Sequence, residues 1–153
     1  MKGRPKVDIG IYLLNEEGNK ILLGFNKIEN RWKLPGGKLQ FSDDFTECAQ
    51  RELYNKLNLK VKAERLEKFV SLNVLDRERN YHSIEVDFHL KLTINEEKFI
   101  KNSSKLDYEW WVWFEYNDIL EVKHELCFGI EAFFKKFKIT SFPQITYIFS
   151  KFT

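Results

Sequence analysis

Two neighbouring groups of residues have types and spacings that could do chemistry. The first contains Gly36, Gly37 and Lys38, in a turn whose glycines allow the backbone to come close to a ligand. The second is the polar face of the segment that follows, where Glu52 and Lys56 stand in the favourable order for a helical ion pair. The glycine turn lacks the spacing and the hydroxyl of a P-loop, so that class of phosphate site is excluded.

A helix must carry this polar face. The pattern predicts one over residues 43–57, with Ser42 as N-cap and Asn58 as a left-handed stop. Its apolar residues recur at spacings of three and four and place one stripe on the core: Phe45, Cys48, Ala49, Leu53 and Leu57.

Strands flank the predicted helix. Apolar segments at 7–13 and 21–25, separated by a turn, predict a β-hairpin. Residues 84–94 alternate and predict a half-buried strand with one polar face. The remaining predictions are one or two strands within 61–72, a charged turn at 76–80, a polar connection at 95–105, an aromatic strand at 108–116, a helix from about 123 to 137 and an extended stretch at 139–153. This order favours an α/β/α sandwich with a mixed sheet.

The composition indicates one folded domain over residues 1–153, with 138–153 as a C-terminal extension. The chain is 43% hydrophobic, and its net charge of +2 permits a phosphate-bearing partner without requiring one. Neither a secretory signal nor a stretch of ~20 apolar residues is evident, so we expect a soluble, intracellular, cytoplasmic protein with no membrane partner. Cys48 and Cys127 are expected to be buried thiols.

The stretch 34–39, followed by Asp43 and by Arg51 and Glu52, resembles the Nudix box. Counting from Gly37 without a gap places Asp43 on the first glutamate of the box, and Arg51 and Glu52 on its Arg-Glu pair. The pattern extends over roughly residues 4–137 and looks most like the MutT-homologue branch. The resemblance implies a Nudix fold and, as ligand, a nucleoside di- or triphosphate or a nucleoside-diphosphate-linked small molecule.

The resemblance also implies a magnesium site that this helix has largely lost. In such enzymes the glutamate after the arginine and a later Glu-Glu pair bind the metal on the substrate's phosphates. The matching positions here are Glu52, Asn55 and Lys56, whose charges sum to zero. Each lost carboxylate removes roughly 8 kcal/mol of Coulomb attraction for a divalent ion at ~4 Å and an effective dielectric of ~20, before desolvation. Magnesium remains a possible cofactor that the helix should hold poorly, and hydrolysis should be weak or absent.

Two interpretations of Lys56 are open. In the first, its ammonium takes the place of the metal, pairing with Glu52 and a ligand phosphate, so that binding persists without hydrolysis. In the second, Lys56 is a solvated surface lysine beside a decayed pocket. Asp43 and Glu47 are both placed to hold Arg51, so the scaffold of the helix is expected to survive in either case.

Further candidates lie outside the box. Glu85 and Asp87, on the polar face of the long strand, are the best candidates to rebuild a metal site with Glu52 in an active hydrolase; alternatively they are solvent-facing strand residues. Phe25 and Trp32 flank the glycine turn and could contact a base or ribose. The full set of ligand-binding candidates is Gly36, Gly37, Lys38, Lys56, Phe25 and Trp32, with Phe41 as a further flanking aromatic residue.

A second class of function is an interaction subunit of a protein or ribonucleoprotein assembly, in which the pocket is vestigial. The apolar tail at 145–149 is unusual for a terminus and favours this class. It could form an edge strand, close a homodimer, dock on a larger assembly or pack on its own domain.

Overall fold

A mixed seven-stranded sheet lies at the centre of the computed structural model, which describes residues 3–102 and 109–151. The strand order is β3-β2-β1-β6-β5, with β4 paired to β1 and β7 paired to β2. Strands β1 and β6 are parallel, and the other pairs are antiparallel. The strands are β1 Lys6–Leu14, β2 Ile21–Asn26, β3 Arg31–Lys33, β4 Gly36–Lys38, β5 Glu67–Asp76, β6 Tyr81–Lys91 and β7 Glu109–Phe114.

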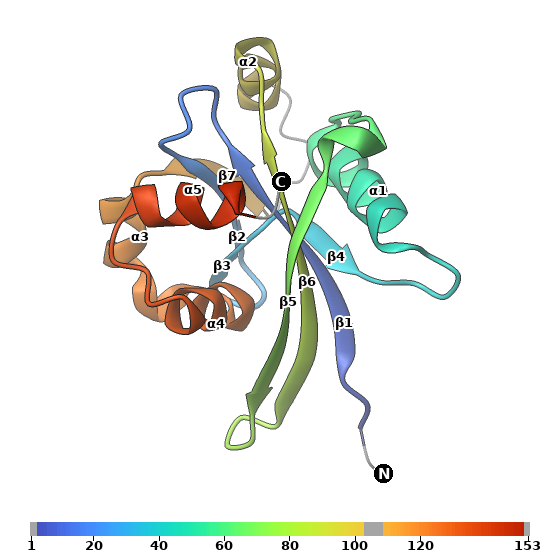
Figure 1. Ribbon diagram of the computed structural model, residues 1–153. Helices are drawn as coiled ribbons and strands as arrows, with labels where there is room; N and C mark the ends of the chain where they lie inside the picture. The colour runs from blue at the N-terminus through green and yellow to red at the C-terminus, as the bar shows by residue number, and fades with distance from the viewer. Residues whose placement is uncertain (1–2, 103–108, 152–153) are drawn as a thin grey trace.

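Helices cover the two faces of this sheet (Figure 1). Helix α1 lies on one face, and α3, α4 and α5 lie on the other, so the predicted α/β/α sandwich with a mixed sheet is confirmed. Helix α2 lies at one end of the sheet. The helices are α1 Phe45–Leu57, α2 Ile94–Asn102, α3 Tyr116–Glu121, α4 Phe128–Lys136 and α5 Phe142–Ser150, with 3-10 turns at Ala63–Arg65 and Lys123–Glu125.

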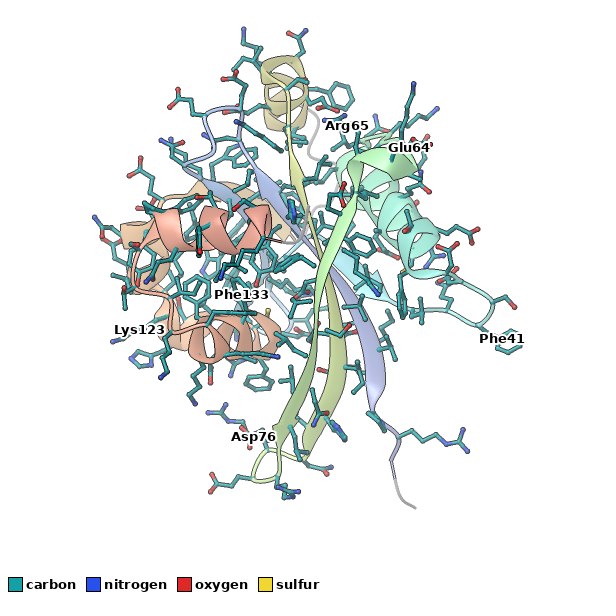
Figure 2. All side chains as sticks on the ribbon, in the orientation of Figure 1. Phe41, Glu64, Arg65, Asp76, Lys123 and Phe133 are labelled. Atoms are coloured by element: carbon teal, nitrogen blue, oxygen red, sulfur yellow. The ribbon has the colours of Figure 1, made fainter. Side chains whose placement is uncertain are left out.

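Strand β1 divides the core in two because its side chains alternate between the faces. Ile9 and Ile11 pack with the apolar stripe of α1, while Tyr12 packs with α4 and α5. In Figure 2, Phe133 of α4 points into this second core. Strand β2 pairs with β1 only where the predicted hairpin closes, after which β4 takes its place beside β1.

Helix α1 begins two residues later than predicted. Asp44, and not Ser42, is the N-cap, and its carboxylate accepts a hydrogen bond of 2.8 Å from the backbone N–H of Glu47. Ser42 lies before the cap in a left-handed turn (φ 70°), where its hydroxyl does not cap the helix. The predicted stop is confirmed, because Asn58 is left-handed (φ 57°) and its N–H bonds to the carbonyls of Leu53 and Tyr54.

Two segments that we expected to be irregular or extended are helical. The predicted polar connection contains α2, whose start has a Thr93 and Glu96 capping box, with reciprocal hydrogen bonds of 3.2 and 2.9 Å. The rest of that connection, residues 103–105, lies outside the described residues, as does residue 108, the first of the predicted aromatic strand. The C-terminal stretch forms α5 instead of extended chain.

Helix α5 buries the apolar tail within its own domain. Ile145 is fully buried and Phe149 is 3% exposed, because apolar residues at helical spacing face the core. Three apolar side chains of the tail, Ile145, Ile148 and Phe149, are therefore covered by its own domain, while Tyr147 stays exposed. None of the described helices combines the length and apolar character needed to cross a membrane.

We expect Phe149→Ala to lower the free energy of unfolding by about 3–5 kcal/mol, because it leaves a cavity beside Tyr12, Phe69 and Phe133. Urea denaturation measures this change. Tyr147→Ala is the matched control on the same helix, since Tyr147 is 60% exposed and its loss should cost about 0.5 kcal/mol or less. Equal effects of the two variants would contradict the buried packing of α5.

Candidate functional site

The carboxyl group of Glu52 rests directly on the glycine strand. A Cβ atom at Gly37 would lie 2.6 Å from the Cδ of Glu52, so any side chain at this position would push the glutamate away. Gly36 is equally restricted, because a Cβ there would overlap the backbone carbonyl of Ile9 on β1. The two glycines therefore hold α1, β4 and β1 in direct contact.

Arg51 ties the loop before α1 to the helix. Its guanidinium donates two hydrogen bonds to Asp43, of 2.6 and 2.9 Å, which confirms the predicted pair. These bonds lower the pKa of Asp43 and raise that of Arg51. The Nε atom of Arg51 also lies 3.7 Å from Oε1 of Glu52. The guanidinium also donates a hydrogen bond of 3.4 Å to the Sγ atom of Cys48, while Glu47, the other predicted partner, is exposed.

The positions that align with the missing carboxylates lie on the same helix. Asn55 is exposed and Lys56 is partly buried. Among residues 3–102 and 109–151, no group of three or more His, Cys, Asp or Glu side chains could hold a metal ion. The pairing of Lys56 with Glu52 stays a prediction.

A pocket of about 140 Å³ opens beside the glycine strand, between the sheet and the start of α4. Gly36, Gly37 and Lys38, three of the predicted ligand-binding residues, line it. Lys56, Phe25 and Trp32 do not belong to its lining. Cys127 does, and burial raises the pKa of its thiol to about 12, which makes it a poor nucleophile.

The polar face of β6 forms the floor of this pocket. Glu85 and Asp87 are 8% and 2% exposed, so the interpretation of these residues as solvent-facing is wrong. The sheet register places Glu85 beside Asp8 and Asp87 beside Gly10. Alternation alone predicts a polar face, but α4 approaches this one so closely that a Cβ atom at Gly129 would lie 2.8 Å from Cδ of Glu85.

Burial dominates the electrostatics of the floor. It raises the pKa of Asp87 well above its ordinary range, and the neighbouring acids Glu85 and Asp8 raise it further. Burial also raises the pKa of Glu85 to about 7, against the opposing effects of a hydrogen bond from Ser83 and of nearby lysines. Lys6 lies 3.3 Å from Asp8 at the rim.

The structure does not bring Glu85 and Asp87 together with Glu52. Gly37 pairs with Ile9, and Glu52 lies over that pair on the α1 side of the sheet. Asp87 is paired with Gly10, the next residue of β1, and so faces the α4 side.

The aromatic candidates beside the glycine turn pack on one another. Phe25 contacts Trp32 and stacks on Trp110, with ring centroids 5.1 and 5.6 Å apart, and Trp32 packs edge-on against Phe114. Phe41 is fully exposed and points away from the molecule (Figure 2). These rings thus lie outside the pocket.

Sequence reasoning missed the rim and one wall of the pocket. Lys6, Asp8 and Gly10 occupy alternate positions of β1, between apolar residues, and the glycine and charges at these positions were a usable signal. Lys33 and Tyr81 also line the pocket, but no local pattern connects them to it.

Because the pKa of Glu85 is raised, we expect the stability of the fold to depend on pH. Between about pH 4.5 and pH 7 the unfolded chain has released the Glu85 proton while the folded protein retains it, so stability falls as pH rises through this window. The loss amounts to about 3 kcal/mol above pH 7. Glu85→Gln should remove this loss. The stability difference between the variant and the native protein should therefore favour the variant more at pH 8 than at pH 4.5. Urea denaturation at both pH values tests this, with Glu47→Gln, on the exposed face of α1, as a control without effect.

Several solved structures align with this fold. A MutT protein from Methanosarcina mazei Go1 aligns with a TM-score of 0.65 at 21% identity, covering 90% of this chain and 96% of that one. A MutT/nudix family protein from Enterococcus faecalis aligns at 0.58 and 20% identity, covering 75% and 45%. A bifunctional NMN adenylyltransferase/ADP ribose pyrophosphatase from Francisella tularensis, complexed with AMP and a manganese ion, aligns at 0.64 and 17% identity, covering 88% and 41%.

The chain therefore spans less than half of the second and third of these proteins, and its likeness to all three shows the fold. The sequence itself matches the family model of the NUDIX domain over residues 4–137, which is most of its length. On this match, the chain belongs to the Nudix family.

Proposed function

We propose that this protein binds a nucleoside di- or triphosphate, or a nucleoside-diphosphate-linked small molecule, and hydrolyses it weakly or not at all. The observation that carries the proposal is the position of Glu52. It is the one carboxylate among the three helix positions that align with the family's metal ligands, and it is held against Gly37 beside Arg51.

The pocket supports binding of an anionic ligand. Lys6, Lys33 and Lys38 line it and can attract phosphate oxygens, while the glycines of β4 let backbone approach the ligand closely. Burial raises the pKa values of the floor acids Glu85 and Asp87, which lessens their repulsion of an anionic ligand. In this proposal the phosphate chain of the ligand lies at β4, near the lysines, and its base lies inside the pocket, against the floor formed by β6.

Loss of hydrolysis follows from the donors at the helix. Magnesium prefers several oxygen ligands, with carboxylates to balance its charge. Glu52 offers one carboxylate, which already lies near Arg51, while Asn55 offers a neutral amide and Lys56 a positive charge. This set does not fit a magnesium ion, so no step of a reaction is assigned to one.

The two alternative functions are an active hydrolase with a rebuilt metal site and an interaction subunit. A metal site rebuilt with Glu85 and Asp87 would have to join groups on opposite faces of the sheet. The interaction subunit was favoured by the apolar tail, whose apolar side chains pack in α5.

The first test is a thermal shift with ATP, GTP, CTP, UTP and ADP-ribose in EDTA. At about 100 times the dissociation constant, a ligand stabilises the folded state by about 2.7 kcal/mol, which raises Tm by several degrees. We expect at least one nucleotide to produce this shift without metal. Magnesium-dependent turnover that Glu52→Gln abolishes would refute the proposal.

The second test restores the family's helix. Asn55→Glu with Lys56→Glu should make the nucleotide-induced shift depend on magnesium, because the helix then presents three carboxylates. Asn55→Gln with Lys56→Gln is the matched control, which removes the lysine without adding acids. A magnesium effect in the native chain as large as in the glutamate variant would contradict our view of this helix.

A further inference from the structure

One oxygen of the buried Asp87 carboxyl has no hydrogen-bond partner in the described part of the chain. The residue is 2% exposed, and its Oδ2 atom has no partner within the described part of the chain. The neighbouring Glu85, in contrast, accepts a hydrogen bond of 3.0 Å from the hydroxyl of Ser83. A buried polar group without a partner destabilises the fold, and so calls for an explanation.

Two glycines keep the space that the floor carboxyls occupy. A Cβ atom at Gly10 would lie 2.7 Å from Oδ1 of Asp87, and one at Gly129 would lie 2.8 Å from Cδ of Glu85. Both glycines and both acids line the pocket. Larger residues on β1 and α4 would displace the carboxyls, whereas the glycines leave them at the pocket.

Asp87 has the character of a neutral acid. Every interaction that shifts its pKa raises it, because burial and the two acids Glu85 and Asp8 all oppose its charge. Lys6, one of the three lysines that line the pocket, lies 3.3 Å from Asp8. A neutral carboxyl presents one O–H donor and one carbonyl acceptor side by side.

We propose that Asp87 determines ligand specificity by hydrogen-bonding the edge of the heterocyclic base. This inference rests on the nucleotide-binding function proposed above. The paired donor and acceptor of the carboxyl match a ring edge that carries an acceptor next to an N–H donor, as nucleobases do. A buried polar group that such an edge satisfies discriminates strongly against ligands that leave it unpaired.

A cation is the other ligand that a group of acids could attract. The acids of the floor do not form a metal-binding group among the described residues. A protonated Asp87 would also have to lose its proton before it could bind a metal ion. A planar heterocycle therefore fits the floor better.

The test compares affinities by isothermal titration in EDTA. The probes are ATP, GTP, CTP and UTP, with inorganic tripolyphosphate as a ligand that lacks a base. We expect the native protein to prefer its best base over its worst by about tenfold or more. Asp87→Leu should reduce this preference to less than about threefold and leave tripolyphosphate binding unchanged. Asp87→Asn, which also offers one acceptor beside a donor, should retain the preference.

Thermal unfolding separates this role from a structural one. Asp87→Leu removes an unpartnered buried polar group, so we expect its Tm to exceed that of the native protein. His89→Phe is the control on the same face of β6, outside the pocket lining, where it also removes a buried atom without a partner. It should leave the base preference unchanged.

The outcomes distinguish the two proposals. If the native protein binds neither nucleotides nor tripolyphosphate, the proposed function is wrong and this inference falls with it. If it binds nucleotides without a base preference, or if Asp87→Leu keeps that preference, only this inference is overturned. Equal loss of preference in Asp87→Leu and Asp87→Asn also overturns the donor and acceptor role, as does a lowered Tm of Asp87→Leu.

Discussion

The close contact of β4 with both of its neighbours is the constraint on which the site depends. Gly36 lies against the backbone of Ile9, and Gly37 lies under the carboxyl of Glu52, with no room for a side chain at either position. One short strand therefore separates the carboxylate of α1 from the pocket on the other face of the sheet. These two glycines therefore fix how closely α1, β4 and β1 approach one another beside the pocket.

The scaffold around this contact does not use the exchanged helix positions. The Arg51 and Asp43 pair joins the loop to α1, and the apolar stripe of α1 packs on the odd-numbered residues of β1. Asn55 and Lys56 belong to neither interaction. The family's fold can thus persist while its metal ligands change, which illustrates why fold and chemistry must be argued separately.

The face of the sheet opposite α1 serves two purposes along its length. At one end Tyr12, Phe133 and Phe149 form an aromatic core, and His89 stacks on Phe149 with ring centroids 4.7 Å apart. At the other end the same face bears Asp87 at the pocket. The aromatic packing helps to offset the cost of burying the Asp87 carboxyl, whose Oδ2 atom has no hydrogen-bond partner among the described residues.

The sequence by itself determined the features that depend on local spacing. These are the stripe of α1, its Asn58 stop, the alternation of β6 and the pairing of Arg51 with Asp43, since each arises within one element or between adjacent ones. Only the tertiary structure decided that the polar face of β6 is buried and that the apolar tail packs on its own domain as helix α5. Alternation shows that a strand has two faces, and apolar spacing shows that a segment needs a partner surface. Which element supplies that cover is set by long-range contacts that no local pattern contains.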